Sequence, residues 1–516
     1  MGKTILIILD GWGIAEPSKG NAVYSAKTPT IDSIENTYFS ASLQASGIAT
    51  GLPWGKEGNS EAGHMNIGAG RIIYQYLPRI VSTIRDESFF KNKTLLSAAD
   101  FVKKNNSTLH LMGLVSSGAV HAYIDNLYGL IEFAKRSEIK KVVIHVFTDG
   151  KDAAEPEEGA DFIKTLQERL KTENIAKIGT IIGRAYAMDR NNKWELIQKT
   201  YNLLTQGVGE KITDPVEYIR NSYKNGKTDF DIEPAVVYEN QNPVGLIGEN
   251  DALVFTHFRE DSARQLTRAF VTASEEFSEF ERKKISNLYF ISMTKYEENL
   301  PVEILFPPLI IKISLAEVLA KNNKTQLHIA ETEKYAHITY FFNGENEKRY
   351  GGEERILVPS TGTPHYNKNP EMQAYNISQK LYENIDKYDF FLLNFANADM
   401  LAHTGDFKAT VLGIEAIDAN LARILNVIKD KDIDLFITAD HGHAENMLNL
   451  KTGEVSLSHT INPVPFYAIG KKFQNKHNLV PLYQRGPIGI LADVAPTILK
   501  NMDLQIPPEM TGKPLI

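Results

Sequence analysis

The sequence of 516 residues contains no cysteine. This absence excludes disulfide bonds, thiolate nucleophiles and cysteine-ligated metals, and it is typical of proteins from a reducing compartment. The first apolar segment, residues 4–9, stops at Asp10 and is too short to span a membrane. It also lacks the small-residue cleavage site of a signal peptide. We therefore expect a cytoplasmic protein without a membrane partner, in which residues 4–9 form a core strand.

Blocks of basic residues are missing as well. The net charge is −8, and no run of Lys and Arg is long enough to follow a phosphate backbone, so the sequence predicts no nucleic-acid partner. The hydrophobic share of 42% and the charged share of 23% are ordinary for a soluble globular protein. Single hydrophobic cores stop growing at roughly 250–300 residues, so a chain of this length predicts two or three domains.

Several apolar runs end in side chains that bind metals. Residues 435–437 lead into Asp440 and His441, and residues 389–395 precede Asp399. The carboxyl ends of strands are where open α/β sheets bind their ligands. Taken singly, each of these polar residues is more typical of a turn or a helix cap than of a metal ligand. Taken together, they supply oxygen and nitrogen donors for two first-row divalent ions; the set is Asp10, Asp399, His403, Asp440, His441 and His459.

A glycine-rich segment, residues 58–70, surrounds Ser60. It is typical either of a tight turn into a helix N-terminus, which attracts anions, or of a flexible surface loop. No Ser-His-Asp order is evident in the sequence, so a metal ion is the expected activator of the Ser60 hydroxyl.

Helical and strand patterns alternate along the middle of the chain. Helices are predicted at 94–104, 124–135 and 156–170, and strands at 108–115, 141–147, 178–182, 235–238, 252–255 and 288–291. A linker is predicted at 305–308, where two prolines break the pattern. Further strands are expected at 326–329 and 389–395. A long helix is expected at 407–429, capped by Asp406, with a core-facing stripe made of Val411, Leu412, Ile414, Ile417, Leu421, Ile424, Leu425 and Ile428.

The domain organisation follows from the predicted metal residues. If Asp10 and Asp440 serve one site, the two ends of the chain share a sheet. We therefore expect one domain from residues 1–77 and 309–516, and an inserted domain from residues 78–308. The predicted fold class is α/β, with two domains that each contain a mainly parallel sheet flanked by helices.

These motifs resemble a known family. The matching segments are Asp10 to Gly13, Gly58 to Arg71, Asn394 to Asp399 with His403, Ala439 to Gly442, and His459 to Pro465. Over essentially the whole chain they are similar to the cofactor-independent (2,3-bisphosphoglycerate-independent) phosphoglycerate mutases of the alkaline phosphatase superfamily. The resemblance implies a monomeric isomerase that interconverts 3-phosphoglycerate and 2-phosphoglycerate, with a phosphatase-like domain and an inserted transferase domain.

The resemblance also implies a role for each matching residue. Asp399, His403 and His459 would bind one Mn²⁺, and Asp10, Ser60, Asp440 and His441 the other, although Co²⁺ and Zn²⁺ accept similar ligands. Ser60 would be the nucleophile, and Lys334 would contact the phosphoserine. Asp152 would be the acid and base that moves protons on the glycerate. The residues that would hold the phosphoglycerate are His121, Lys151, Asp152, Arg184, Arg190 and Arg259.

Departures from the family pattern lie mainly in the substrate set. Lys151 replaces an Arg, and Ser262 replaces a second Arg, with Arg264 two residues further along the chain. Tyr123 belongs to an altered His121 loop. His443 stands where the family has Asn. Two alternatives therefore stay open: a metal-dependent phosphomutase or phosphatase that acts on a different small phosphate ester, and a catalytically silent protein that binds a metabolite.

Overall fold

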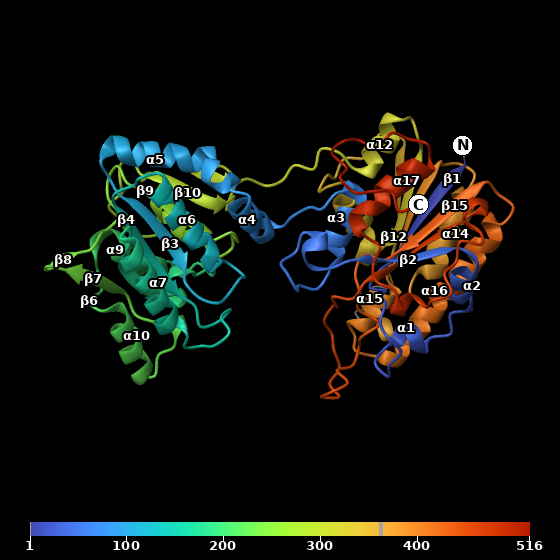
Figure 1. Cartoon of the computed structure of the whole chain (residues 1–516), viewed down its shortest axis with the longest axis horizontal. Coiled ribbons are helices and arrows are strands. Elements are labelled where there is room, and N and C mark those ends of the chain that lie inside the picture. Colours follow the sequence, from blue (N-terminus) through green and yellow to red (C-terminus); the bar gives the residue numbers. More distant parts are fainter. Residues whose placement is uncertain (1, 361–364) are drawn as a thin grey trace. The chain divides into compact units, whose positions relative to one another are not determined.

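The computed structural model describes residues 2–360 and 365–516, and the chain divides into two compact units (Figure 1). The first unit contains Met1–Gln75 and Ile310–Ile516, and the second contains Tyr76–Leu309. Each unit is built on its own sheet with helices packed against it, which confirms the α/β class. Within the described ranges, none of the helices combines the length and the apolar character that a bilayer crossing requires.

The sheet of the first unit has eight strands among the described residues. Their spatial order is β13 (Glu353–Val358), β12 (Gln326–Glu331), β14 (Phe390–Phe395), β1 (Lys3–Leu9), β15 (Ile433–Thr438), β16 (Val464–Ile469), β2 (Phe39–Gln44) and β17 (Gly489–Ile490). The five strands from β13 to β15 are parallel, whereas β16 is antiparallel to both of its neighbours. The two ends of the chain therefore share one sheet.

Strand β1 lies at the centre of this sheet, and its position brings the predicted metal residues together. It pairs with β14 on one side and β15 on the other, with Leu9 opposite Phe395 and Ile8 opposite Thr438. Every residue of β1 after Lys3 is buried, because helices cover both faces of the sheet. Asp10 and Asp440 thus leave neighbouring strands at the same edge.

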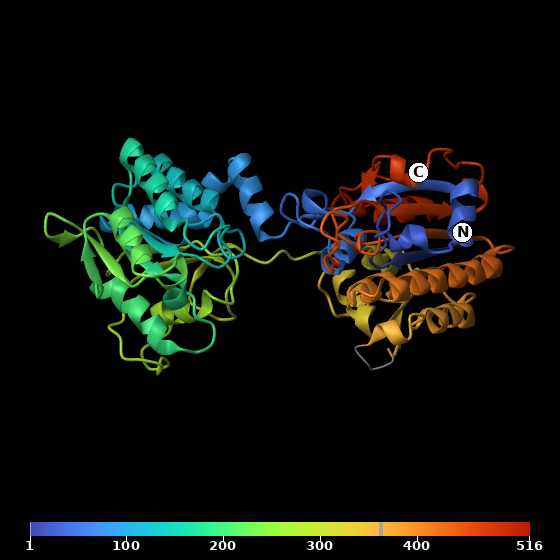
Figure 2. The same cartoon turned by 90° about the horizontal axis from the view of Figure 1, so that it is seen from below.

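Helices cover the two faces of the first sheet. One group packs around α16 (Phe407–Ile428), the long orange helix along one side of the sheet in Figure 2, and contains α1 (Ala22–Ser25), α2 (Pro29–Thr37) and α14 (Ala374–Asn384). Another group consists of α3 (Ser60–Ala69), α12 (Leu315–Lys321) and α17 (Val494–Asn501). The short helices α13 (Thr332–Ala336) and α15 (Asn397–Ala402) follow strands β12 and β14.

The prediction for helix α16 is largely confirmed. Asp406 caps it by accepting a hydrogen bond from Ala409 N at 3.0 Å. The apolar stripe packs on the core, except that Leu412 is 44% exposed. The assignment of Leu412 to the core was wrong because it lies two residues from the buried positions Thr410 and Ile414, and a separation of two turns a side chain toward the opposite side of a helix.

The second unit contains a nine-stranded sheet among the described residues. Its order is β11 (Glu303–Phe306), β10 (Tyr289–Thr294), β9 (Ala252–Phe255), β3 (Leu109–Leu114), β4 (Val142–Thr148), β5 (Lys177–Gly183), β7 (Ala235–Glu239) and β6 (Glu210–Ile212), with β8 (Asn242–Pro243) paired to β7. The pairs from β11 to β5 are all parallel.

Two hydrophobic clusters lie against this sheet. One contains buried residues of α4 (Tyr76–Arg85), α5 (Lys93–Asn105), α6 (Ile124–Arg136), α7 (Gly159–Glu173) and α10 (Pro215–Lys224). The other contains residues of α8 (Arg184–Ala187), α9 (Trp194–Gln206) and α11 (Arg264–Val271). Neighbours in β3 divide between the clusters, with Leu111 in the first and Met112 in the second. This alternation places a core on each face of the sheet.

Two sequence-based boundaries are wrong. Leu305 and Phe306, assigned to a linker, are buried in the edge strand β11, so the strand ends directly before Pro307. Helix α7 begins at Gly159 rather than residue 156, because Asp229 Oδ2 accepts the N–H groups of Glu158 and Gly159 at 2.9 and 2.8 Å and so fixes the first turn there.

Candidate active site and metal centre

Four neighbouring parallel strands deliver the candidate residues of the first unit. Strand β1 ends at Asp10, β15 leads to Asp440 and His441, β14 leads into α15 with Asp399, and β12 leads into α13 with Lys334. Because parallel strands present their carboxyl ends at one edge, these side chains meet there. All five are buried, with exposed fractions between 0% and 4%.

Ser60 occupies the first position of helix α3. Asn59 caps the helix by accepting a hydrogen bond from Ala62 N at 2.8 Å, so the segment is a helix start rather than a flexible loop. Ser60 Oγ donates to Asp10 Oδ1 at 3.2 Å and lies 3.0 Å from His441 Nε2. The Nδ1 atom of His441 faces the carbonyl of Gly442 at 3.3 Å, where a Ser-His-Asp triad would have a carboxylate.

Lys334 joins the serine to two carboxylates. Its Nζ atom donates to Ser60 Oγ at 2.9 Å, to Asp10 Oδ1 at 2.6 Å and to Asp399 Oδ2 at 2.7 Å. Burial opposes its charge, but Asp10 and Asp399 outweigh burial and raise the pKa of Lys334, so it stays protonated. The ammonium group therefore faces the atom that would accept a phosphoryl group.

Electrostatics favour cations at this site. Burial favours the neutral form of Asp10 and Asp399, but Lys334 overcomes it and holds the pKa of both carboxyls well below the usual range. Burial also opposes protonation of His441, yet Asp440 and Asp10 raise its pKa to about 9. Among the described residues, the three carboxylates of Asp10, Asp399 and Asp440 thus face two cationic side chains, Lys334 and His441, which leaves an excess of negative charge.

A second cluster surrounds the other oxygen of Asp399. The Nε2 atoms of His403 and His459 lie 3.4 and 3.3 Å from Asp399 Oδ1 and 3.1 Å from each other. His403 follows Asp399 by four residues around α15, as its spacing predicted. His459 Nδ1 donates to the carbonyl of Gly58 at 2.9 Å, which directs Nε2 toward the carboxylate.

The donor atoms fit divalent cations. Three groups have ligand atoms within 4.8 Å of one another: Asp399 with His403, His443 and His459; Asp10 with Asp399 and His441; and Asp10 with His64 and Asp440. Asp440 Oδ2 is buried and accepts no hydrogen bond from the described residues. A buried carboxylate oxygen without a donor requires another partner, and a cation supplies one.

Sequence reasoning missed three residues that support this site. His64 Nδ1 lies 3.1 Å from Asp440 Oδ2, and Asn394 donates to Asp10 Oδ2 at 2.8 Å. Glu445 Oε2 accepts the backbone N–H groups of Gly13 and His443 at 3.1 and 2.8 Å. The spacing of four between Ser60 and His64 was a usable signal, because it places both side chains on one face of a helix.

The predicted substrate residues line one cavity of 230 Å³ in the second unit. Its lining includes His121, Lys151, Asp152, Arg184, Arg190, Arg259 and Ser262. Arg184 Nη1 pairs with Asp149 and, at 2.7 Å, with Asp152 Oδ2. The lining contains four cationic side chains, of which Arg184, Arg190 and Arg259 are paired with carboxylates in or beside the cavity. Guanidinium and ammonium groups are the donors that bind the oxygens of a small acid.

Asp261 is paired with two of the arginines that line this cavity, and the sequence analysis did not assign it to the site. It pairs with Arg190 at 2.6 Å and with Arg259 at 3.2 Å, and lies 3.5 Å from His121 Nδ1. Ser262 Oγ lies 2.9 Å from His121 Nδ1. Arg264 does not share this surface; it donates to the carbonyl of Tyr296 at 3.1 Å instead.

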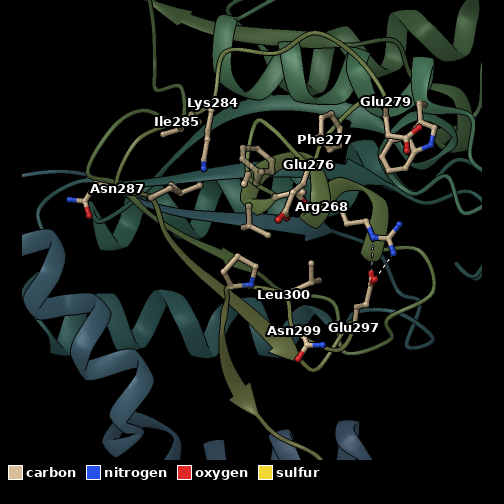
Figure 3. Close-up of a pocket in the computed structure, with 17 residues that line it drawn as sticks. Arg268, Glu276, Phe277, Glu279, Lys284, Ile285, Asn287, Glu297, Asn299 and Leu300 are labelled. Atoms are coloured by element: carbon tan, nitrogen blue, oxygen red, sulfur yellow. Dashed lines mark hydrogen bonds and ion pairs between the residues drawn. The ribbon is translucent and has the colours of Figure 1, made fainter.

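A larger cavity of 700 Å³ lies elsewhere in the second unit (Figure 3). Aromatic and acidic residues line much of it, including Phe277, Glu276 and Glu279. Its Arg268 is paired with Glu297, Nε lying 2.7 Å from Oε2. None of the candidate substrate residues lines this cavity, so its size alone assigns it no role.

Glu331, at the end of β12, gives the first unit a pH-dependent stability. Burial raises its pKa to about 7, against 4.5 in an exposed chain. The folded state therefore holds a proton that the unfolded chain has lost, and the contribution of Glu331 to stability falls as pH rises from 4.5 to 7. Against the non-titrating variant Glu331→Gln, the native protein should lose about 3 kcal/mol of unfolding free energy between pH 4.5 and 8.

Denaturant unfolding of the two proteins at both pH values measures this change. Any constant effect of the amide cancels in the comparison. An equal difference in stability at pH 4.5 and pH 8 would contradict the raised pKa.

Comparisons with known proteins place this site in context. The chain matches the model of the Metalloenzyme superfamily over residues 2–506. The fold and the site thus define a metal-dependent α/β enzyme of that superfamily. The chain is 45% identical to the 2,3-bisphosphoglycerate-independent phosphoglycerate mutase of Clostridioides difficile (99% of this chain, 98% of the relative) and 46% identical to that of Clostridium botulinum (99% of both). The chain belongs to the family of 2,3-bisphosphoglycerate-independent phosphoglycerate mutases.

A solved structure agrees with this assignment. The chain is similar to Leishmania mexicana phosphoglycerate mutase, solved at low cobalt concentration, with a TM-score of 0.55 and 28% sequence identity. The similarity covers 99% of this chain and 97% of that one. The family resemblance identified from the sequence motifs is therefore confirmed.

Proposed function

We propose that the protein interconverts 3-phosphoglycerate and 2-phosphoglycerate through a phosphoserine at Ser60, without bisphosphoglycerate. The observation that carries this proposal is the contact of Ser60 Oγ with Asp10, His441 and Lys334 at the start of α3. A helix N-terminus and an ammonium group both favour the charge of a phosphoryl group. The relatives named above suggest the substrate. We further propose a cytoplasmic monomer.

The metal ligands follow the two clusters of the first unit. Asp10, Ser60, Asp440 and His441 would hold one Mn²⁺, and Asp399, His403 and His459 the other. When bound, the ions supply positive charge against the phosphoryl oxygens and lower the pKa of the serine hydroxyl. Co²⁺ and Zn²⁺ accept the same donor types.

Ser60 and Lys334 perform the first half of the reaction. Ser60 would release its hydroxyl proton to solvent, because the bound ions lower its pKa. The bond between Ser60 Oγ and phosphorus then forms as the bond between phosphorus and the glycerate oxygen breaks. Lys334 Nζ, 2.9 Å from Ser60 Oγ, stabilises the charge that develops on the transferring group. The covalent intermediate divides one difficult exchange into two simpler transfers.

The cavity of the second unit is proposed to hold the glycerate. Arg184, Arg190, Arg259 and Lys151 would bind its carboxylate and phosphate oxygens. Asp152 would give a proton to the oxygen that loses phosphorus. It would then take a proton from the second hydroxyl as that oxygen attacks the phosphoserine and Ser60 is released.

Two features of the cavity favour the alternative function, a phosphomutase or phosphatase that acts on a different phosphate ester. Ser262 Oγ lies within hydrogen-bond distance of His121 Nδ1, at 2.9 Å. Lys151 carries a single ammonium group, whereas an arginine could donate two parallel hydrogen bonds to one acid group. Both features change how the cavity holds an acid, while they leave Ser60 and the metal donors unchanged. The alternative therefore concerns the substrate and the fate of the phosphoryl group.

The test is ³¹P NMR of 3-phosphoglycerate with metal-stripped protein, before and after addition of Mn²⁺ and without bisphosphoglycerate. We expect a 2-phosphoglycerate signal that grows only after Mn²⁺ is added. Free phosphate in its place would favour the phosphatase alternative. No change in the spectrum, with Mn²⁺ shown to be bound, would contradict the proposed substrate.

A further inference from the structure

His443 is a third imidazole at the carboxylate of Asp399, beyond the two predicted there. It is fully buried, and its Nδ1 atom lies 2.8 Å from Asp399 Oδ1. Its ring lies 4.3 Å from that of His403 and 4.9 Å from that of His459, measured between centroids. Its Nε2 atom has no hydrogen-bond partner among the described residues. One carboxylate oxygen is thus surrounded by nitrogens from three histidines.

Protons alone do not satisfy this arrangement. His459 donates its Nδ1–H to Gly58, so a neutral His459 presents the lone pair of Nε2 to Asp399 Oδ1 and to His403 Nε2. His403 can donate its Nε2–H to His459 at 3.1 Å, but the lone pairs of His459 Nε2 and Asp399 Oδ1, 3.3 Å apart, repel one another unless a cation lies between them.

The spacing of the donors matches four-coordinate geometry. Bonds of 2.0–2.1 Å to nitrogen and oxygen, typical of Zn²⁺, place the donors of a tetrahedron about 3.3–3.4 Å apart. The distances from Asp399 Oδ1 to His403 and His459 are 3.4 and 3.3 Å, and the two histidines are 3.1 Å apart. The Nδ1 atom of His443 lies closer to the same oxygen, at 2.8 Å, and all four donors lie within 4.8 Å of one another.

We propose that His443 is a metal ligand, so that Asp399, His403, His443 and His459 form a four-coordinate site with three nitrogens and one oxygen. This inference rests on the proposed metal-dependent function and changes the expected ion at this position. A nitrogen-rich site with four donors favours Zn²⁺ or Co²⁺, whereas Mn²⁺ prefers more oxygen ligands and binds most weakly in the divalent series. The other cluster, rich in carboxylate oxygen, keeps its preference for Mn²⁺.

The competing role of His443 is a hydrogen bond that only positions Asp399. The variant His443→Asn separates the two roles. The Asn amide nitrogen lies at nearly the same place along the side chain as Nδ1 of His, so it can still donate to Asp399 Oδ1. The amide has no imidazole lone pair, so the variant retains the positioning contact and loses the ligand.

The experiment compares metal-stripped native protein and His443→Asn in competition titrations with Zn²⁺ and Mn²⁺ alone, without phosphoglycerate. The native protein should bind one Zn²⁺ with an affinity at least about tenfold higher than that of the variant. A loss of this size is the lower limit seen when residues that only hydrogen-bond to metal ligands are replaced. Mn²⁺ affinity should change much less. His328→Asn is the matched control, since His328 is a buried histidine of the same unit outside the cluster. Unchanged Zn²⁺ affinity in a folded His443→Asn would overturn the proposal.

A crystal structure of the native protein with Zn²⁺ gives a second measurement that does not depend on a variant. A distance of about 2.0–2.1 Å between His443 Nδ1 and the ion supports ligation, and a distance beyond hydrogen-bond range overturns it. Failure of the proposed function gives a different result: the protein would bind ions through His443 yet leave 3-phosphoglycerate unchanged in the ³¹P spectrum.

Discussion

Ser60→Ala should abolish phosphoryl transfer while leaving the fold and the separate cluster of Asp399, His403 and His459 largely intact. Ser60 Oγ lies within hydrogen-bond distance of Asp10, His441 and Lys334. Among the described residues, it is the hydroxyl to which Lys334 donates a hydrogen bond. Loss of a nucleophile from a comparable covalent mechanism lowers kcat by a factor on the order of 10⁶. The rate is measured by ³¹P NMR at saturating Mn²⁺.

A control and a trapping experiment make the result specific. Ser378 is another fully buried serine of the first unit, and its hydroxyl donates to the carbonyl of Ala374 within helix α14. Ser378→Ala should retain nearly native activity. Acid quenching of the native enzyme during turnover, followed by mass spectrometry, should find phosphate on the peptide that contains Ser60. Appreciable transfer by folded Ser60→Ala would contradict the assignment of the nucleophile.

The convergence of the candidate metal residues was largely predictable from the sequence because these residues follow buried strands directly. The apolar runs before Asp10 and Asp440 specify strands, and parallel strands deliver their carboxyl ends to one edge. The structure adds the order of the strands, in which β1 lies between β14 and β15. Sequence distance does not reveal that order, since residues 10 and 440 become neighbours only through the sheet.

Supporting residues were harder to predict because tertiary packing decides their partners. Asp261 holds Arg190 and Arg259, which lie in separate loops of the second unit. Strand β16 was also missed, because Pro465 argues against a strand inside a sheet. In the structure Pro465 lies opposite Ser42, and its carbonyl accepts a hydrogen bond from Thr438 Oγ1 at 2.9 Å. Local sequence patterns do not predict such contacts, because the residues that make them are far apart along the chain.

Lys334→Met should lower both the transfer rate and the stability of the metal-stripped protein. The substitution preserves an unbranched side chain of similar length but removes the ammonium group that neutralises Asp10 and Asp399. Breaking a buried ion pair by removal of one partner costs about 3–5 kcal/mol. Removing a charge that stabilises the transition state lowers kcat by about 10²–10³-fold.

The dependence on metal separates these two effects of Lys334. Bound divalent ions neutralise the same carboxylates, so saturating metal should restore most of the stability of Lys334→Met, whereas the slow transfer should persist. Denaturant unfolding with a chelator and with Mn²⁺ measures the first effect, and ³¹P NMR the second. Lys56→Met is the control: Lys56 is exposed and, within the described ranges, its ion pair is with Glu57 at 3.1 Å, so its loss should change stability by less than about 1 kcal/mol. If Lys334→Met is destabilised equally with and without metal, Lys334 stabilises the fold by packing. The proposal that bound ions replace the charge of Lys334 is then wrong.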